Sequence, residues 1–372
     1  MSITFMDEER ATFEKFLPGL EQRLRDVPIA VLESGESPGL RLLREHGGPG
    51  LLVPTRYGGA GADLIEALRV QRVLGARSPS LALAANMHHC TVVAMPPCRV
   101  TEELLTEVAS EHRYLASGFG EGRPAASVLK PTMRGERHGD GWRLNGAKRP
   151  CSLSLSMDYL TASVMLTLPD TGGTEMALAV VPASSPGLEV RPLGATGVLP
   201  GSETHEVVLT DVDVPDGHVS SFGDPQSLNA ALATAFHVFE LMVSASYTGV
   251  AGGLVEEVLR RRRGTPGERV ELVGALEATM ASLEAVARSA PAAIGEPAGV
   301  ARALHVRYAA QRTVERVAAH AAELLGGTSY LIDGFGVGYL TAARALAFHP
   351  PARGAMAEPL DRFLYGEPLV IP

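Results

Sequence analysis

The chain has 372 residues, of which 45% are hydrophobic and 20% are charged, and its formal net charge is −9 at pH 7. A chain of this length can bury roughly 75% of its unfolded surface, which is enough for one large domain or for two to three smaller ones. The acidic balance excludes a protein that binds nucleic acid through a basic domain, because such proteins neutralise phosphates with lysine and arginine.

The first third of the chain, residues 7 to about 113, is predicted to be helical. Apolar residues recur at helical spacing, for example between residues 64 and 74. Asp63 precedes that run and Glu66 follows three residues later, which is the spacing of a capping box. We therefore expect a helix that begins directly after Asp63.

A further apolar stretch, residues 81–95, carries His88 and His89 and is also predicted to be helical. Adjacent residues on a helix point about 100° apart, so this pair cannot chelate one metal ion from a single face. We expect both histidines to lie in the core or at the surface. The rest of the sequence contains no other pattern of metal ligands, and no metal is expected.

The middle part, residues 114 to about 222, changes to short alternating segments that predict β-strands. The expected strands are residues 141–146, 159–166, 175–181, 188–192 and 206–214. Turns are expected at the dipeptides Asp140-Gly141 and Asn145-Gly146, because Asp-Gly and Asn-Gly favour tight turns.

The last part, from residue 223 onward, is predicted to be helical again. Residues 228–259 are apolar on nearly every face, as expected for a helix buried among other helices or at a subunit interface. A second long helix is expected over residues 302–325, ended by Gly326 and Gly327. The sequence thus predicts an α+β fold. Its expected domains are residues 1–113, 114–222 and 223–372.

Three features favour a cytoplasmic protein that does not enter a membrane. The three cysteines are sparse and show no metal-binding or disulfide spacing, as in a reducing compartment. The first ten residues have neither the basic nor the apolar segment of a signal peptide. The apolar stretch 228–259 contains His237, Glu240 and the pair Glu256-Glu257, which makes it too polar to span a bilayer.

Five short phrases, taken in order, resemble the acyl-CoA dehydrogenase family over nearly the whole chain. They are Pro54-x-x-Tyr-Gly-Gly-Ala-Gly61, Asn86-Met-His-His89, Gly141-Trp-x-Leu-Asn-Gly-x-Lys148, the segment from Val207 to Pro215, and Leu325-Gly326-Gly327-x-x-Tyr330 followed by Arg344. The resemblance rests on the order and spacing of these phrases. It implies an N-terminal helical domain, a middle antiparallel β-barrel-like domain and a C-terminal four-helix bundle.

The same resemblance implies a flavin site in the middle domain. In the family, one wall of that site is the segment that corresponds to residues 114–121, which includes Phe119 and Glu121. Ser152 falls at the position of a hydroxyl group that contacts the flavin N5 atom. The resemblance therefore assigns Phe119, Glu121 and Ser152 to cofactor binding.

The family signature that contains Gly326, Gly327 and Arg344 implies a second part of the cofactor site. In the family it receives the adenylate half of FAD from a neighbouring subunit, so a homodimer or homotetramer is expected. Glu323 stands where the family has a glutamine, and the family's Phe-Gly phrase is not found near residues 261–268. FMN is therefore an alternative to FAD.

The first functional hypothesis is the family's own reaction, α,β-dehydrogenation of an acyl thioester on CoA or an acyl-carrier protein, with an electron-transfer flavoprotein as partner. The usual glutamate base corresponds to Arg353, which cannot act as a base near neutral pH. Glu240 lies near the place where some branches carry the base, in an apolar run that should raise its pKa. The alternative for Glu240 is a pair with an arginine or a helix contact.

The second hypothesis comes from Arg344-Ala-Leu-Ala-Phe-His-Pro-Pro351, which resembles a phrase of flavin monooxygenases with the same fold. That group includes dibenzothiophene monooxygenases and amine N-oxygenating enzymes, which take reduced flavin from a reductase. Their histidine, with a serine, holds or protonates the oxygen-bearing flavin, so His349 and Ser152 are the counterparts. The alternative for His349 is a histidine favoured by a helix C-terminus. A third hypothesis is a non-catalytic member that binds acyl groups or a partner.

Overall fold

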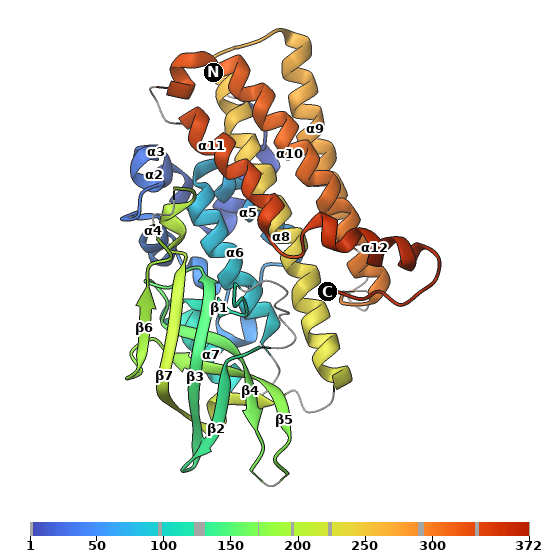
Figure 1. Ribbon diagram of the computed structural model, residues 1–372. Helices are drawn as coiled ribbons and strands as arrows, with labels where there is room; N and C mark the ends of the chain where they lie inside the picture. The colour runs from blue at the N-terminus through green and yellow to red at the C-terminus, as the bar shows by residue number, and fades with distance from the viewer. Residues whose placement is uncertain are drawn as a thin grey trace.

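The computed structural model passes from helices through one sheet and back to helices (Figure 1). It describes residues 3–95, 99–122, 131–169, 171–194, 197–221, 225–288, 294–331 and 335–371. The α+β fold predicted from the sequence is confirmed, because helices form both ends of the chain and strands form its middle.

The N-terminal helices surround α5 and α6, which follow one another almost without a break. The helices are α1 (Asp7–Phe16), α2 (Leu20–Asp26), α3 (Ile29–Leu32), α4 (Gly39–Glu45), α5 (Leu64–Arg77), α6 (Pro79–Ala94) and α7 (Arg99–Ser110). The capping box before α5 is confirmed: the Asp63 carboxylate accepts from the Glu66 N–H at 2.8 Å, and the Glu66 carboxylate accepts from the Asp63 N–H at 2.9 Å.

The sheet has the order β6-β7-β3-β2-β4-β5-β8, and β1 pairs with β4. The strands are β1 (Leu115–Gly118), β2 (Arg134–His138), β3 (Gly141–Cys151), β4 (Tyr159–Thr167), β5 (Thr174–Pro182), β6 (Leu188–Arg191), β7 (His205–Pro215) and β8 (Val219–Ser221). Most pairings are antiparallel, but β4 runs parallel to both β1 and β2. The expectation of a wholly antiparallel sheet was therefore wrong in these two pairings.

The turn predicted at Asn145-Gly146 was also wrong. Strand β3 continues through both residues, and its pairing with β7 shifts there, which makes a bulge. Gly146 takes a φ of 146°, a value that suits glycine. The Asn145 side chain binds Asp211 of β7 through two hydrogen bonds, at 2.9 Å and 3.1 Å, so the strand is held on the sheet instead of reversing.

The C-terminal helices pack around α8, which also contacts the N-terminal helices (Figure 1). They are α8 (Pro225–Arg260), α9 (Pro266–Ala287), α10 (Pro297–Leu331), α11 (Phe335–Arg344) and α12 (Arg353–Leu364), with the short 3-10 turn η6 (Ala345–Phe348) before α12. Within α8, the segment Ala233–Arg260 is long and apolar enough to cross a membrane, but 94% of its most apolar window is buried inside the protein.

The end predicted for the second long helix coincides with a break in α10. Gly326 has a non-helical φ of 82° and ψ of 173°, so α10 consists of two helices that meet at this glycine. The predicted interruption at Gly326 is therefore confirmed. The sequence did not indicate that a second, short helix follows at once and runs to Leu331.

Candidate functional site

Glu240 lies in the most apolar part of α8 and is fully buried, as is Arg307 of α10 (0% and 1% exposed). The Arg307 Nε atom lies 2.9 Å from a carboxylate oxygen of Glu240. Burial raises the pKa of Glu240 to about 8, and the neighbouring guanidinium opposes that rise. Pairing of Glu240 with an arginine, one of the two alternatives open from the sequence, is therefore what the structure contains.

Arg307 also fastens the segment that joins η6 to α12. Its two terminal nitrogens donate to the carbonyl oxygens of Leu346 at 3.3 Å, His349 at 2.6 Å and Pro351 at 2.8 Å. A guanidinium has five N–H donors in a rigid plane, so one side chain can hold several carbonyl groups and a carboxylate at once. The backbone around His349 is thus fixed by a residue on a different helix.

The ring of His349 is held by α8. Its Nε2 atom lies 2.8 Å from the Tyr247 hydroxyl oxygen, and its ring meets Phe239 edge-on at a centroid distance of 6.1 Å. Burial, and secondarily the charge of Arg307, lower the pKa of His349 to about 4. His349 is therefore neutral near pH 7, and no described residue hydrogen-bonds to its Nδ1 atom.

Glu240 and His349 are therefore brought together, through Arg307, although they were predicted for two different chemistries. Tyr247 and Arg307 were missed. Tyr247 follows Glu240 by seven residues, which places both on one face of α8. Arg307 lies on the apolar face of α10, and a charged residue on such a face needs a buried partner of opposite charge. That pattern was a signal from which Arg307 could have been found.

A second group of predicted residues lies at the edge of the sheet, where the ends of β1 and β3 meet. The Arg149 N–H donates to the Gly120 carbonyl at 2.8 Å, which joins the two segments. Ser152 follows β3 in a turn, is 8% exposed, and shares a hydrogen bond of 2.9 Å with the Thr204 hydroxyl. Phe119 follows β1 and is partly buried. The structure thus brings Phe119 and Ser152 to neighbouring segments.

Glu121 occupies the same edge, but its carboxylate is engaged within the sheet. It accepts from the buried Lys148 ammonium at 2.8 Å and from the Thr132 and Met133 N–H groups at 2.8 Å to 3.2 Å. These donors lower the pKa of Glu121 to about 2 despite its burial. Glu121 therefore joins the residues directly before β2 to β3, and its charge is neutralised by Lys148.

Gly326, Gly327 and Arg344 lie on α10 and α11, apart from the sheet edge in the single chain. A Cβ atom added at either glycine would meet no heavy atom within 4 Å, so the backbone there is uncovered. Arg344 is exposed and pairs with Glu315 at 3.0 Å. The structure does not bring these three residues next to Ser152 within one chain.

His88 and His89 are core residues, as expected. His88 Nε2 lies 2.9 Å from the Pro49 carbonyl, and its Nδ1 accepts from the Leu115 N–H at 2.9 Å. His89 Nε2 lies 3.1 Å from the Gly48 carbonyl. The two rings thus join α6 to residues 48–49, which lie before α5, and to β1. Among the described residues, no three His, Cys, Asp or Glu side chains gather as metal ligands.

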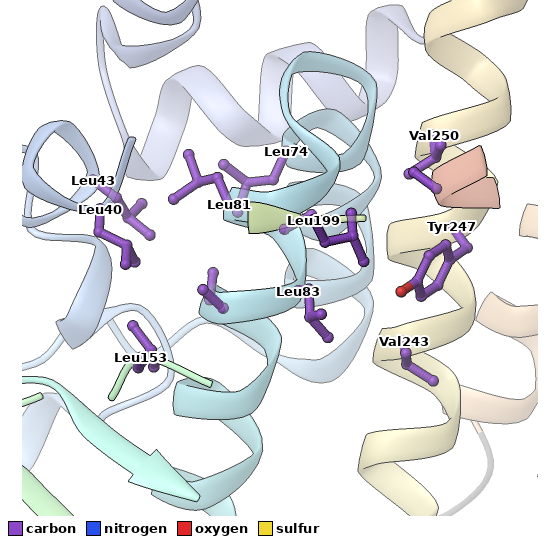
Figure 2. Packing of buried hydrophobic residues seen from close by; sticks show 14 of the residues in the cluster. Leu40, Leu43, Leu74, Leu81, Leu83, Leu153, Leu199, Val243, Tyr247 and Val250 are labelled. Atoms are coloured by element: carbon purple, nitrogen blue, oxygen red, sulfur yellow. The ribbon is translucent and has the colours of Figure 1, made fainter. Parts of the chain in front are cut away.

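The space between the sheet edge and α8 is apolar. Figure 2 shows Leu153, which follows Ser152, in one buried cluster with Leu83 of α6 and with Val243 and Tyr247 of α8. A polar residue of α8 is also buried. His237, one turn before Glu240, is 1% exposed, and within the described part of the chain neither of its ring nitrogens has a hydrogen-bond partner.

These residues fit a flavin better than they fit a metal ion. The available groups are the Ser152 hydroxyl, the Nδ1 atom of His349 and the uncovered backbone at Gly326 and Gly327. Hydroxyl and backbone donors beside apolar side chains suit the polar edge and the flat face of an isoalloxazine ring. The nearby carboxylates Glu121 and Glu240 are both paired with cations, so neither leaves an uncompensated charge beside the ring.

Two cavities of the described structure lie elsewhere. One, of about 840 Å³, is lined by the N-terminal segment, α8 and α9. The other, of about 400 Å³, lies between α10 and α12 and is lined by Tyr308, Arg312 and Arg353 among others. Arg353 is exposed in the first turn of α12, so the position that carries a glutamate in the dehydrogenase pattern supplies no base here.

Comparison with known sequences gives relatives for almost the whole chain. Residues 7–105 match the model of the acyl-CoA dehydrogenase N-terminal domain. The chain is 42% identical to isobutylamine N-hydroxylase of Streptomyces viridifaciens, over 98% of this chain and 99% of that protein. It is 26% identical to FadE25 of Mycobacterium tuberculosis, a probable acyl-CoA dehydrogenase, over 76% of this chain and 75% of the relative.

Solved structures share the fold at low sequence identity. FMN-bound TdsC from Paenibacillus sp. A11-2 superposes with a TM-score of 0.80 and 16% identity, over 100% of this chain and 99% of that chain. KijD3 in complex with FMN and a dTDP-sugar gives a TM-score of 0.80 and 19% identity, over 96% and 94%. With a relative that is 42% identical over nearly the full length, the chain belongs to the acyl-CoA dehydrogenase family.

Proposed function

We propose that this protein, a flavin-dependent oxidoreductase, is a monooxygenase that hydroxylates the nitrogen of a small primary amine. The observation that carries the proposal is the 42% identity over nearly the full length with an isobutylamine N-hydroxylase. The site supports it, because Arg353 replaces the usual base and Glu240 is already paired with Arg307. The balanced reaction converts the amine, O₂ and reduced flavin into the hydroxylamine, water and oxidised flavin.

The residues of the chain provide what this reaction needs from the protein. When bound, the reduced flavin activates O₂ so that one oxygen atom can be transferred. Ser152 and His349 hold and orient the flavin, and His349, being neutral, has one N–H to donate toward the reacting oxygen. The apolar side chains around Leu83 and Val243 exclude water, which limits loss of the oxidising equivalent to solvent.

The site also favours the amine in its neutral, nucleophilic form. A primary alkylamine is a cation in water at pH 7, but a buried apolar site disfavours the charged form. The Glu240 carboxyl group is engaged with Arg307, so no free carboxylate holds the amine as an ammonium ion. His237 offers a buried imidazole without a partner in the described structure, which supports its use in binding the amine.

FMN is the cofactor that this site supports best, with FAD as the alternative. Glu323, three residues before Gly326, is exposed and would repel the pyrophosphate that FAD adds. The solved structures of TdsC and KijD3 were both determined with FMN. We further propose that a separate flavin reductase supplies the reduced cofactor, and that the protein is a homodimer or homotetramer in which the uncovered glycine pair of α10 faces a neighbouring subunit.

The proposal is tested by supplying the purified protein with FMN, NADH, a flavin reductase and a series of primary amines from ethylamine to hexylamine. We expect hydroxylamine products, detected by mass spectrometry, only when protein, reductase and O₂ are all present. The His349→Ala variant should lose product while the reductase still oxidises NADH. Absence of a hydroxylamine from every amine in the series would contradict the proposal.

Acyl-thioester dehydrogenation is the second candidate. Two observations favour it: the 26% identity with a probable acyl-CoA dehydrogenase, and the pKa of Glu240, which at about 8 suits a general base. If this reaction occurs, the protein with bound flavin will bleach anaerobically when an acyl-CoA is added. An electron-transfer flavoprotein would then be the partner. The Glu240→Gln variant should lose this bleaching, and retained bleaching would remove Glu240 from the role of base.

A further inference from the structure

Two residues hold His349, and each acts on a different part of it. Arg307 binds its backbone carbonyl at 2.6 Å, together with two other carbonyls of the same segment, which places the residue. Tyr247 contacts its Nε2 atom at 2.8 Å, which orients the ring. The remaining nitrogen, Nδ1, has no hydrogen-bond partner in the described structure and is the one left for a ligand.

The hydrogen bond between the Tyr247 hydroxyl and the His349 Nε2 atom can run in either of two directions. Either the phenol donates to Nε2, so that the imidazole carries its proton on Nδ1, or Nε2–H donates to the phenol oxygen, so that Nδ1 is a bare acceptor. A phenol is a stronger acid than a neutral imidazole, and an imidazole nitrogen is a stronger base than a phenol oxygen. The first arrangement is therefore the more stable one.

Tyr247 and His349 are both neutral in these surroundings, so the two directions of the hydrogen bond differ in the tautomer of His349. Tyr247 is 2% exposed, and burial raises its pKa, which keeps the phenol protonated. The charged groups that act on the pair are Arg307 of α10, its partner Glu240 of α8, and Glu33 at the end of α3. Glu33 accepts from the Ser80 hydroxyl at 2.6 Å and lies on the side of the N-terminal helices.

We propose that Tyr247 is a positioning residue that fixes His349 as its Nδ1–H tautomer, so that this N–H is directed to the ligand. In free histidine the Nε2–H tautomer is favoured, so the tyrosine reverses the ordinary preference. The use of the N–H as a donor to the reacting oxygen rests on the proposed monooxygenase function. The assignment of the tautomer does not rest on that function, because it follows from the contacts within the chain.

The tautomer is measured directly by ¹⁵N NMR of protein labelled at its histidine ring nitrogens, without flavin or substrate. The protein has 11 histidines, so the His349 signals are assigned by their loss in a His349→Gln variant. We expect Nε2 of His349 to have the shift of an unprotonated acceptor and Nδ1 that of an N–H, and we expect Tyr247→Phe to reverse the two. An Nε2–H signal in the wild-type protein overturns the proposal even if the variant fails to fold.

The matched control is Tyr339→Phe. Tyr339 of α11 is equally buried, at 1% exposed, and its hydroxyl donates to the Ala76 carbonyl at 3.1 Å without contact to His349. This variant loses a buried hydroxyl in the same way, and we expect the His349 signals to stay unchanged. A reversed tautomer in the control would overturn the assignment of the effect to Tyr247.

An activity measurement separates this inference from the proposed function. In the amine assay, Tyr247→Phe should lower the ratio of hydroxylamine formed to O₂ consumed about tenfold, because the reacting oxygen loses its N–H donor. An unchanged ratio would overturn the role of Tyr247 in the reaction. If wild-type protein shows the Nδ1–H tautomer but forms no hydroxylamine, the proposed function fails and the structural part of the inference stands.

Discussion

At the scale of single residues, Arg307 organises the candidate site. Its guanidinium binds Glu240 and three carbonyl groups of the segment that carries His349. A buried ion pair contributes little net stability, because both charges must leave water, but removal of one partner leaves the other uncompensated. The pair therefore holds α8, α10 and the segment before α12 in fixed positions relative to one another.

The first prediction concerns this ion pair in the Glu240→Gln variant. Above pH 8, where Glu240 is ionised, the buried charge of Arg307 then loses its counter-ion, so we expect the free energy of unfolding at pH 9 to fall by about 3 to 5 kcal/mol. Urea denaturation followed by circular dichroism measures the change. Glu315→Gln is the matched control, because Glu315 pairs with the exposed Arg344 and its loss should cost about 1 kcal/mol or less.

If the free energy of unfolding falls by the same small amount in both variants, the role of the Glu240–Arg307 pair is contradicted. The same Glu240→Gln variant also separates structure from catalysis. If the glutamate serves only as the counter-ion of Arg307, the folded fraction of the variant keeps its hydroxylation activity.

Single residues were predictable from the sequence where their type was unusual for their surroundings. Glu240 stood out because it interrupts an apolar run, and His349 because it precedes two prolines. Tyr247 gave no such signal, since a tyrosine is ordinary in a helix core. Its importance arises from a contact across 102 residues of sequence, and no local pattern contains that information.

At the scale of elements, the close packing of α5 against α8 positions the site. A Cβ atom at Gly249 of α8 would overlap the backbone carbonyl of Arg72 in α5, and one at Gly75 of α5 would overlap the carbonyl of Ser246. The two helices therefore touch backbone to backbone at two glycines. Tyr247 lies between Ser246 and Gly249, so the part of α8 that carries its ring is packed directly against α5.

The second prediction compares two glycine-to-alanine substitutions in helices. Gly249→Ala must push α8 away from α5, so we expect a loss of about 2 kcal/mol or more, as for overpacked cores. Gly274 of α9 has no atom within 4 Å of an added Cβ, so Gly274→Ala should stabilise the protein by about 0.5 to 1 kcal/mol. Thermal unfolding of both variants tests this. A tolerated Gly249→Ala would show that the helices are not in backbone contact.

Helices and strands were predictable where hydrophobic periodicity determines the secondary structure. They were not predictable where pairing with neighbouring strands determines it. Helices α5, α6 and α8 and strands β4 and β5 lie close to the expected ranges. Strand β2 was missed because its residues are polar and Gly135 alone among them is buried. The bulge at Gly146 was misread as a turn, because the sheet partners on both sides of β3 hold the strand extended.

At the scale of the whole molecule, the order of helices, sheet and helices followed from the change in periodicity along the sequence. The candidate site did not, because its contacts join α8, α10 and the segment after η6, which are distant in sequence. Buried ionisable groups gathered by this assembly also determine how the stability of the molecule depends on pH.

The third prediction concerns that dependence. The folded-state pKa is about 3 for His88 and about 4 for His89 and His349, below the ordinary value near 6.5. Between pH 6.5 and 4 the unfolded chain therefore binds more protons at these sites, so the free energy of unfolding falls as the pH falls. Glu240, whose pKa is raised to about 8, binds a proton in the folded state and opposes this by one proton.

For these four groups the net difference is two protons, which contributes a slope of about 2 to 3 kcal/mol per pH unit near pH 5. Burial also lowers the pKa of His237, which acts in the same direction as the other histidines. Urea unfolding at pH 7, 6, 5.5 and 5 measures the slope. The His349→Gln variant should reduce the slope by one proton. A stability that is constant from pH 7 to pH 5 would contradict the burial of these neutral rings.

The most direct test of the account is a single-turnover reaction under ¹⁸O₂. The protein is mixed with chemically reduced FMN and isobutylamine, and the products are analysed by mass spectrometry. We predict an N-hydroxylated amine that carries one ¹⁸O atom, formed by the wild-type protein and lost in His349→Ala. No labelled hydroxylamine, together with anaerobic bleaching of the bound flavin by an acyl-CoA, would contradict the account and favour the dehydrogenase reaction.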